Sequence, residues 1–134
     1  MKILSILAIA LFAAQTSSID FIGLAKPEII KVMQKNNPGF DLDDGVVNKT
    51  YNYLKFVDKY NEETWLFFLS SDNVCTNTKL MSDYSNLNLR VNELNKQFKN
   101  AGENKWVGIE KGKVFTVELK KEEWFFSIII KPKK

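Results

Sequence analysis

Hydrophobic positions run almost without a break from Trp124 to Ile130, in the order Trp-Phe-Phe-Ser-Ile-Ile-Ile. Side chains of a β-strand alternate between two faces, so a strand here would be hydrophobic on both. One face would carry Trp124, Phe126, Ile128 and Ile130, and the other Phe125 and Ile129. Such strands are typical of the interior of a sheet that is covered on both sides. We therefore expect this strand at the centre of the sheet.

A second stretch, Thr64–Leu69, is also hydrophobic on both predicted faces. We expect it close to the C-terminal strand in the centre of the sheet. Four more strands are indicated by β-branched and aromatic residues between turn signals. They cover Lys49–Tyr60, Val74–Met81, Lys105–Glu110 and Lys113–Leu119. The last two form a predicted hairpin across Lys111-Gly112.

Two helices are predicted from hydrophobic residues at helical spacing. The first begins at Pro27, carries Ile29, Val32 and Met33 on one face, and ends at the Asn36–Gly39 stop signal. The second has the clearest hydrophobic stripe in the chain. The stripe consists of Leu87, Val91, Leu94, Phe98 and Ala101. Asp83 or Ser85 is the predicted cap at its start, and Gly102 follows as a left-handed cap at its end.

The predicted order of elements is therefore αβββαβββ. Short connections between consecutive strands favour antiparallel pairing. The fold class that follows is α+β, with a mostly antiparallel sheet packed against two helices in a single compact domain over residues 19–134. A length of 134 residues, 45% of them hydrophobic, allows one domain with a genuine core.

The first 18 residues have the three-part pattern of a secretory signal peptide. Lys2 supplies a positive charge, Ile3–Ala14 is hydrophobic apart from Ser5, and small and polar residues follow up to Ser18. The hydrophobic run is too short for a convincing membrane span. We expect cleavage between residues 14 and 18, an exported product that is periplasmic or secreted, and no membrane span after signal removal.

Charge and cysteine content narrow the range of partners. Cleavage would remove Lys2 and no acid, so the 19 basic residues become 18 against 16 acidic ones. This balance is too small to favour nucleic acid or an anionic membrane as a partner. Cys75 is the sole cysteine, which excludes an internal disulfide. We expect it to be an inert structural residue, with a lone nucleophile or a disulfide between chains as the alternatives. On the predicted strand it shares a face with Asn77, Lys79 and Met81.

The residue types present exclude several kinds of chemistry. The chain has no histidine, so it has no Ser-His-Asp or Cys-His set and no imidazole ligand for zinc. It has no glycine-rich phosphate loop. The acidic cluster Asp41–Gly45 has the wrong register for an EF-hand, because Phe40 and Leu42 occupy the first two ligand positions. We therefore predict no catalytic residue, no cofactor and no metal site.

Three residues are candidates for binding a ligand or partner: Trp106, Glu110 and Leu89. If Val107 and Ile109 face the core, Trp106 lies on the opposite face in line with Glu110, as a flat platform for a sugar or a partner's side chain. The alternative is that a helix or a terminus covers Trp106, because tryptophan is highly buried on average. Leu89 points away from the hydrophobic stripe of its helix.

The sequence thus favours an exported, non-enzymatic domain that binds another protein or an envelope macromolecule. Binding of a small ligand or glycan on an aromatic sheet face is the second hypothesis. An enzyme that uses carboxylates, lysine or tyrosine is the third.

Overall fold

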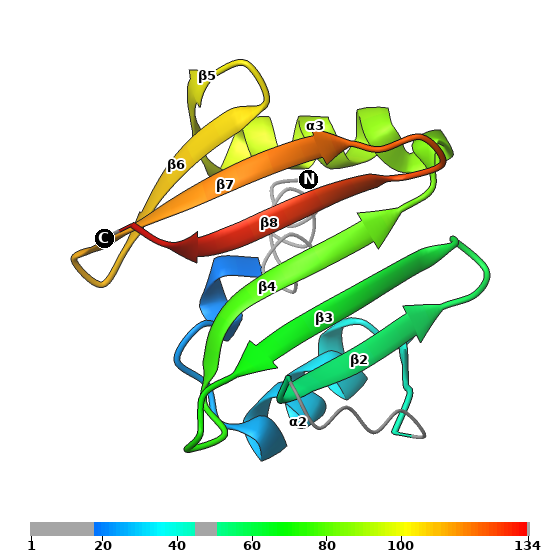
Figure 1. The fold of residues 1–134 in the computed structure, drawn as a ribbon, viewed down its shortest axis with the longest axis vertical. Coiled ribbons are helices and arrows are strands. Elements are labelled where there is room, and N and C mark those ends of the chain that lie inside the picture. The colour runs from blue at the N-terminus through cyan, green and yellow to red at the C-terminus, as the bar shows by residue number, and fades with distance from the viewer. Residues whose placement is uncertain (1–17, 45–50, 134) are drawn as a thin grey trace, which may run out of the picture.

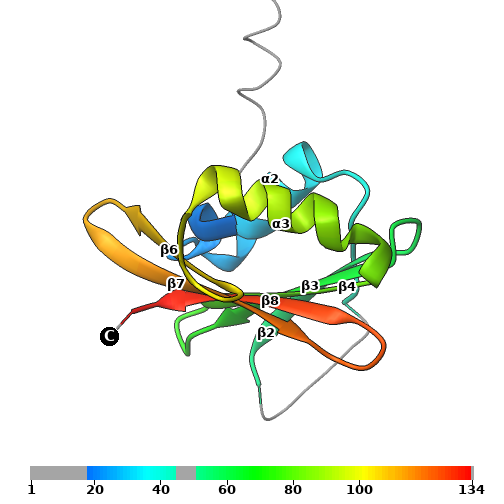
Figure 2. The ribbon, with the colours of Figure 1, turned by 90° about the horizontal axis from the view of Figure 1, so that it is seen from above.

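The computed structural model describes residues 18–44 and 51–133. A single eight-stranded antiparallel sheet forms one layer, and two helices form a second layer on one of its faces (Figures 1 and 2). The α+β prediction is therefore confirmed. The predicted signal peptide, apart from Ser18, lies outside the described residues.

The elements alternate in two similar runs. The helices are α2 (Lys26–Asn36) and α3 (Leu87–Gln97), and two short 3-10 turns are η1 (Ser18–Phe21) and η2 (Tyr84–Asn86). The first four strands are β1 (Asp41–Leu42), β2 (Tyr53–Asp58), β3 (Glu63–Leu69) and β4 (Cys75–Ser82). The last four are β5 (Lys99–Gly102), β6 (Lys105–Glu110), β7 (Lys113–Lys121) and β8 (Phe126–Pro132).

Each helix is followed by a four-stranded antiparallel meander. The spatial order is β1-β2-β3-β4-β8-β7-β6-β5, so the last strands of the two meanders, β4 and β8, lie side by side at the centre. Thr78 of β4 pairs with Ile130 of β8. The two halves of the fold are thus alike in topology, although the sequence carries no visible repeat.

The C-terminal strand is central as predicted, but its start and its surroundings differ from the prediction. It begins at Phe126, whereas Trp124 lies in the preceding turn with 79% of its surface exposed. Phe126, Ile128 and Ile130 are buried under the helices. Ile129 is half-buried on the outer face, which no element of the described chain covers (Figure 2). The expectation of cover on both faces was therefore wrong.

The core lies between the helices and the inner face of the sheet. Ile29 and Met33 of α2 are fully buried against it. Its centre is aromatic: the Trp65 ring stacks on Phe67 at a centroid distance of 5.1 Å and meets the edge of Phe21 at 5.3 Å. Such pairs add to the area that each ring buries.

A local signal is visible at the start of α2, where the Ala25 N–H donates to the Glu28 carboxylate at 3.1 Å. Asp83 accepts from the Ser85 N–H at 2.9 Å and so caps η2, whereas α3 begins after Asn86, which makes no side-chain cap bond, and the predicted cap of α3 was wrong. The α3 helix ends at Gln97 and not at Ala101, because Phe98 is already extended with φ −130°. The next four residues form β5, and Gly102 ends that strand and does not cap the helix. This strand was not predicted.

Three smaller expectations need correction. The two-residue strand β1, at the start of the acidic cluster Asp41–Gly45, was not among the predicted strands. Within the described part of the predicted strand Lys49–Tyr60, only Tyr53–Asp58 is a strand. A register shift beside Phe68 turns Cys75 inward, where it is 2% exposed, while Lys79 lies on the outer face. Cys75 thus shares the face of Thr78, as a bulge allows.

Among the described residues, no helix combines the length and hydrophobicity that crossing a membrane requires.

Candidate functional site

The predicted platform Trp106 faces the helices and is only 3% exposed. Its indole N–H donates to Asn95 of α3 at 2.8 Å. Val107 and Ile109 lie on the outer face, with Ile109 72% exposed, so of the two orientations considered for Trp106 the structure has the one in which a helix covers it. The reason is a close approach by Phe98, whose ring carbon lies 2.7 Å from the point where a Cβ on Gly108 would be. The strand can meet the end of α3 only with its glycine turned inward.

The structure does not bring the three predicted binding residues together. Leu89 is 60% exposed in the first turn of α3, as expected from its position off the stripe. Glu110 ends β6 at the opposite end of the sheet, beside the Lys111-Gly112 turn. Both residues of that turn have positive φ, 52° and 78°, as a tight hairpin turn requires.

A different group of exposed hydrophobic side chains does gather at one end of the molecule. The β2–β3 turn, the β7–β8 turn and the start of α3 lie at this end, on the right of Figure 1. We call it the hairpin end and define it by Tyr60, Leu89, Trp124 and Phe125. Their exposed fractions are 93%, 60%, 79% and 36%. The two turns are three strand spacings apart, or roughly 14 Å. Such a group is typical of a surface that contacts another macromolecule.

Hydrogen bonds fix both turns of the hairpin end. Buried Asp58 accepts from the backbone N–H and the side-chain amide of Asn61, at 3.0 and 2.8 Å. The Asn86 amide donates to the Asn61 carbonyl at 2.7 Å. On the other turn, the Tyr84 hydroxyl donates to the backbone carbonyl of Glu122. The short η2 segment therefore ties the two hairpins to each other and to α3.

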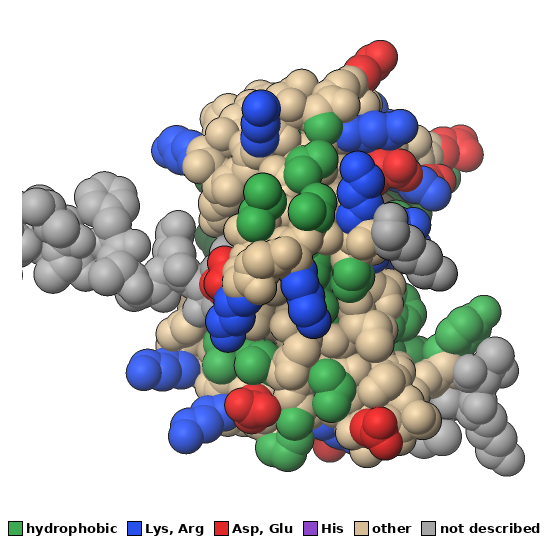
Figure 3. Space-filling view, turned by 90° about the vertical axis from the view of Figure 1, so that its left-hand side faces the viewer, with side chains coloured by type: hydrophobic (Ala, Val, Ile, Leu, Met, Phe, Trp, Pro, Cys, Tyr) green, Lys and Arg blue, Asp and Glu red, His purple; other side chains and the backbone are tan. Residues whose placement is uncertain are grey.

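The far end of the molecule exposes fewer large hydrophobic side chains. There, hydrophobic side chains are interspersed with lysine and acidic side chains (Figure 3). Of the exposed large hydrophobic residues in the described chain, only Ile109 and Tyr51 lie away from the hairpin end. The concentration of exposed aromatic rings is thus specific to the hairpin end.

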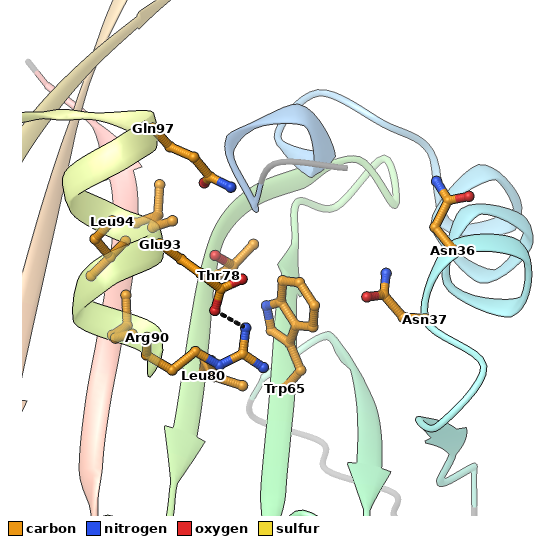
Figure 4. A pocket seen from close by; sticks show the side chains of 11 residues that line it. Asn36, Asn37, Trp65, Thr78, Leu80, Arg90, Glu93, Leu94 and Gln97 are labelled. Carbon is orange, nitrogen blue, oxygen red and sulfur yellow. Dashed lines mark hydrogen bonds and ion pairs between the residues drawn. The ribbon is translucent and has the colours of Figure 1, made fainter. Parts of the chain in front are cut away.

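A second feature is a hollow on the helix side of the sheet, which we call the α2–α3 cleft. Its volume is about 160 Å³. Trp65 and Thr78 contribute to its floor, Asn37 to the α2 side, and Arg90 and Glu93 to the α3 side (Figure 4). Ile130 of β8 also lines it. Unlike the hairpin end, the cleft is a partly open hollow lined by both polar and hydrophobic side chains.

A buried ion pair closes one side of the cleft. Arg90, the chain's only arginine, donates from Nε and Nη2 to the two carboxylate oxygens of Glu63 at 2.8 and 2.5 Å. Glu63 is 5% exposed and also accepts from the Ser82 hydroxyl at 2.9 Å. Nη1 of Arg90 reaches Glu93 at 3.3 Å. Burial alone would lower the pKa of Arg90, but the bonds and charges of Glu63 and Glu93 outweigh it and raise that pKa.

Neither feature has the groups of a familiar catalytic centre. The Cys75 thiol is buried, and burial raises its pKa to about 12, so little thiolate forms at neutral pH. No group of three or more His, Cys, Asp or Glu side chains suited to a metal ion occurs in the described ranges.

No protein family, no curated protein and no solved structure matches this chain. The function is therefore inferred from the fold and from the hairpin end and the α2–α3 cleft.

Sequence reasoning missed Tyr60 and Trp124 because it placed both within strands. The turn residues Asn61–Glu63 and Lys120–Glu123 adjoin these aromatics and were the signal that both lie at hairpin tips. For the cleft, the only signal was a single arginine in a lysine-rich chain, since arginine is preferred for buried, bidentate ion pairs. Thr78 and Trp65 carried no signal, because only the packing of two helices makes a cleft above them.

Proposed function

We propose that this chain is an exported, non-enzymatic domain that binds another protein through the hairpin end. The observation that carries the proposal is the set of exposed Tyr60, Leu89, Trp124 and Phe125 side chains at one end of the sheet. Tryptophan and tyrosine are the residues most enriched at the energetic centres of protein interfaces. Fixed turns lower the entropy that binding costs, because the loops are already ordered.

The second hypothesis from the sequence was binding of a small ligand or glycan on an aromatic sheet face. Trp106 does not support it, because α3 covers this side chain. An enzymatic role has little support, because the chain lacks histidine and its one thiol is buried and protonated. The exposed hydrophobic side chains therefore favour binding of another protein over these two functions.

The test compares two surface variants of the exported full-length product as bait in its native medium or envelope. Tyr60→Ser/Trp124→Ser removes two rings from the hairpin end. Ile109→Ser removes an exposed hydrophobic side chain at the other end and is the matched control. We expect a specific partner to be captured by the unmodified protein and by the control, and capture to fall at least tenfold with the double variant. Equal capture by all three proteins would refute the proposal.

A further inference from the structure

The floor of the α2–α3 cleft contains two residues with polar side-chain groups, Trp65 and Thr78. Trp65 is 4% exposed and Thr78 is 1% exposed, and both side chains line the cleft. Among the described residues, the one fully buried side-chain polar atom without a partner is Ser127 Oγ, which does not line the cleft. The indole N–H of Trp65 and the Thr78 hydroxyl belong to residues that do line it. They are the donors that the floor offers to a molecule in the cleft.

Three aromatic rings hold the Trp65 ring in place. Phe67 stacks on it at 5.1 Å, and Phe21 and Phe40 make edge contacts with it at 5.3 and 5.7 Å. Figure 4 shows the indole nitrogen turned toward the α3 side, where Arg90 and Glu93 project. The ring is thus held rigidly, and its N–H has a fixed direction into the cleft.

The walls supply further polar groups of both kinds. Arg90 has five N–H groups, three of which donate to Glu63 and Glu93. The Asn37 amide N–H₂ donates to the sulfur of Met33 at 3.5 Å, and its oxygen projects toward Trp65 (Figure 4). Glu93, whose side chain is 33% exposed, is an additional acceptor. Donors from the floor therefore face acceptors from the walls.

The charge of the cleft limits the class of ligand. Arg90 contributes one positive charge, and Glu63 and Glu93 contribute two negative ones. An anion would meet a net negative wall, and a cation could not accept from the Trp65 and Thr78 donors. A neutral ligand whose groups both donate and accept would satisfy all of them without breaking the ion pair.

We propose that the α2–α3 cleft binds a small neutral ligand with several hydroxyl groups, the size of one sugar ring. Its volume of about 160 Å³ is below the roughly 300–1,000 Å³ of sites for drug-sized molecules, so one ring fits and an oligomer does not. A hydroxyl of the ligand accepts from Trp65 and Thr78 on the floor and donates to Asn37 or Glu93 on the wall. The cleft shares no lining residue with the hairpin end. Failure of sugar binding would therefore leave the proposed protein-binding function untouched.

The experiment follows the three tryptophan indole signals in ¹H–¹⁵N spectra of the exported protein during titration. The probes are D-glucose, D-galactose and N-acetyl-D-glucosamine, with glycine, acetate and tetramethylammonium as zwitterionic, anionic and cationic counterparts. We expect at least one sugar to shift the Trp65 indole signal saturably, while the signals of Trp106 and Trp124 stay in place. No saturable shift with any sugar, or a stronger response to a charged probe, would overturn the proposal.

Three threonine variants locate the binding. Thr78→Val removes the hydroxyl with little change of shape and should weaken sugar binding at least tenfold, whereas Thr78→Ser keeps the hydroxyl and should bind within threefold of the unmodified protein. Thr64→Val, on the outer face of β3, is the matched control. If Thr78→Val does not fold, Asn37→Ala on the α2 side takes its place. Unchanged affinity in the folded cleft variant would place the ligand elsewhere and refute the site.

Discussion

The side-chain amide of Asn86, just before α3, donates to the backbone carbonyl of Asn61 in the β2–β3 turn at 2.7 Å. The same amide reaches the Ser82 hydroxyl at 3.0 Å, and that hydroxyl donates in turn to Glu63. A single side chain thus connects the exposed hairpin end to the buried ion pair that closes the cleft. Loss of the Asn86 side chain is therefore expected to remove one bond to the β2–β3 turn and one bond to Ser82.

Asn86→Ala removes both bonds of this amide and leaves the Asn61 carbonyl to water. A hydrogen bond of this type contributes about 1 kcal/mol, so we expect a loss of about 1–2 kcal/mol in the free energy of unfolding. Urea denaturation measures it. Asn92→Ala, on the exposed side of α3, is the control and should be neutral or slightly stabilising, because alanine is the better helix former. Equal midpoints for the two variants would show that the Asn86 bonds do not stabilise the fold.

Arg90→Met leaves Glu63 buried without its counter-charge. Breaking a buried pair lowers the free energy of unfolding by roughly 3–5 kcal/mol. We expect about 3 kcal/mol here, because 21% of the Arg90 side-chain surface remains exposed to solvent. The double variant Glu63→Gln/Arg90→Met removes both charges and should recover part of that loss. Thermal unfolding of the two variants gives the comparison. A double variant less stable than Arg90→Met would mean that Glu63 is stabilised by Ser82 and not by the arginine.

Gly108→Ala introduces a methyl group 2.7 Å from a ring carbon of Phe98. Overpacking of this kind costs roughly 1–3 kcal/mol, because the Phe98 ring must shift to make room for the methyl group. Combining it with Phe98→Leu makes room, so the pair of substitutions should be less harmful than the sum of the two. Urea midpoints of the single and double variants test this coupling. Strict additivity would indicate that the methyl group is accommodated elsewhere.

Cys75 makes stability depend on pH in the alkaline range. Burial raises the pKa of its thiol from 9.0 to about 12 in the folded protein. The stability present below pH 9.0 is therefore lost as the pH rises through about 12, because the unfolded chain releases the thiol proton first. Urea midpoints at pH 8 and pH 10 should fall more for the unmodified protein than for Cys75→Ala. Parallel declines in both proteins would assign the effect to other groups.

Iodoacetamide labelling gives an independent measurement on the same thiol. At pH 8 the folded protein should react far more slowly than the protein in urea, because the sulfur is both buried and protonated. Rapid labelling under native conditions would show that β4 opens locally.

The helices and strands with a periodic hydrophobic pattern could be predicted from the sequence. Which face of a strand points toward the helices could not. The hydrophobic stripe of α3 and the runs of β3 and β8 identify those elements, because burial selects such patterns strongly. In β6, by contrast, Trp106 and Val107 are both acceptable in a core, and only the approach of Phe98 to Gly108 decides between them. A strand that is hydrophobic on both faces likewise did not reveal that one face is uncovered.

The candidate sites illustrate the same division. Leu89 could be predicted as exposed from its own helix, since helical spacing fixes its direction. Tyr60 and Trp124 belong together only because β4 and β8 pair and bring distant hairpins to one end. Predicting the cleft would have required more information. Its donors come from β3 and β4, and its walls come from two helices whose positions the sequence alone does not give. Long-range pairing is the information that local patterns lack.

The meeting of the two meanders at β4 and β8 has a consequence for how the chain folds. Within each meander, neighbouring strands follow one another through short turns, so their contacts are local. The ladder that joins the halves is not local, since Thr78 pairs with Ile130 and the whole second meander lies between them in the chain. Closing so long a loop costs entropy before its contacts are gained, and non-local pairing slows folding. We expect both meanders to form early and the central ladder to form last, so that substitutions at Thr78 or Ile130 accelerate unfolding and leave the folding rate nearly unchanged.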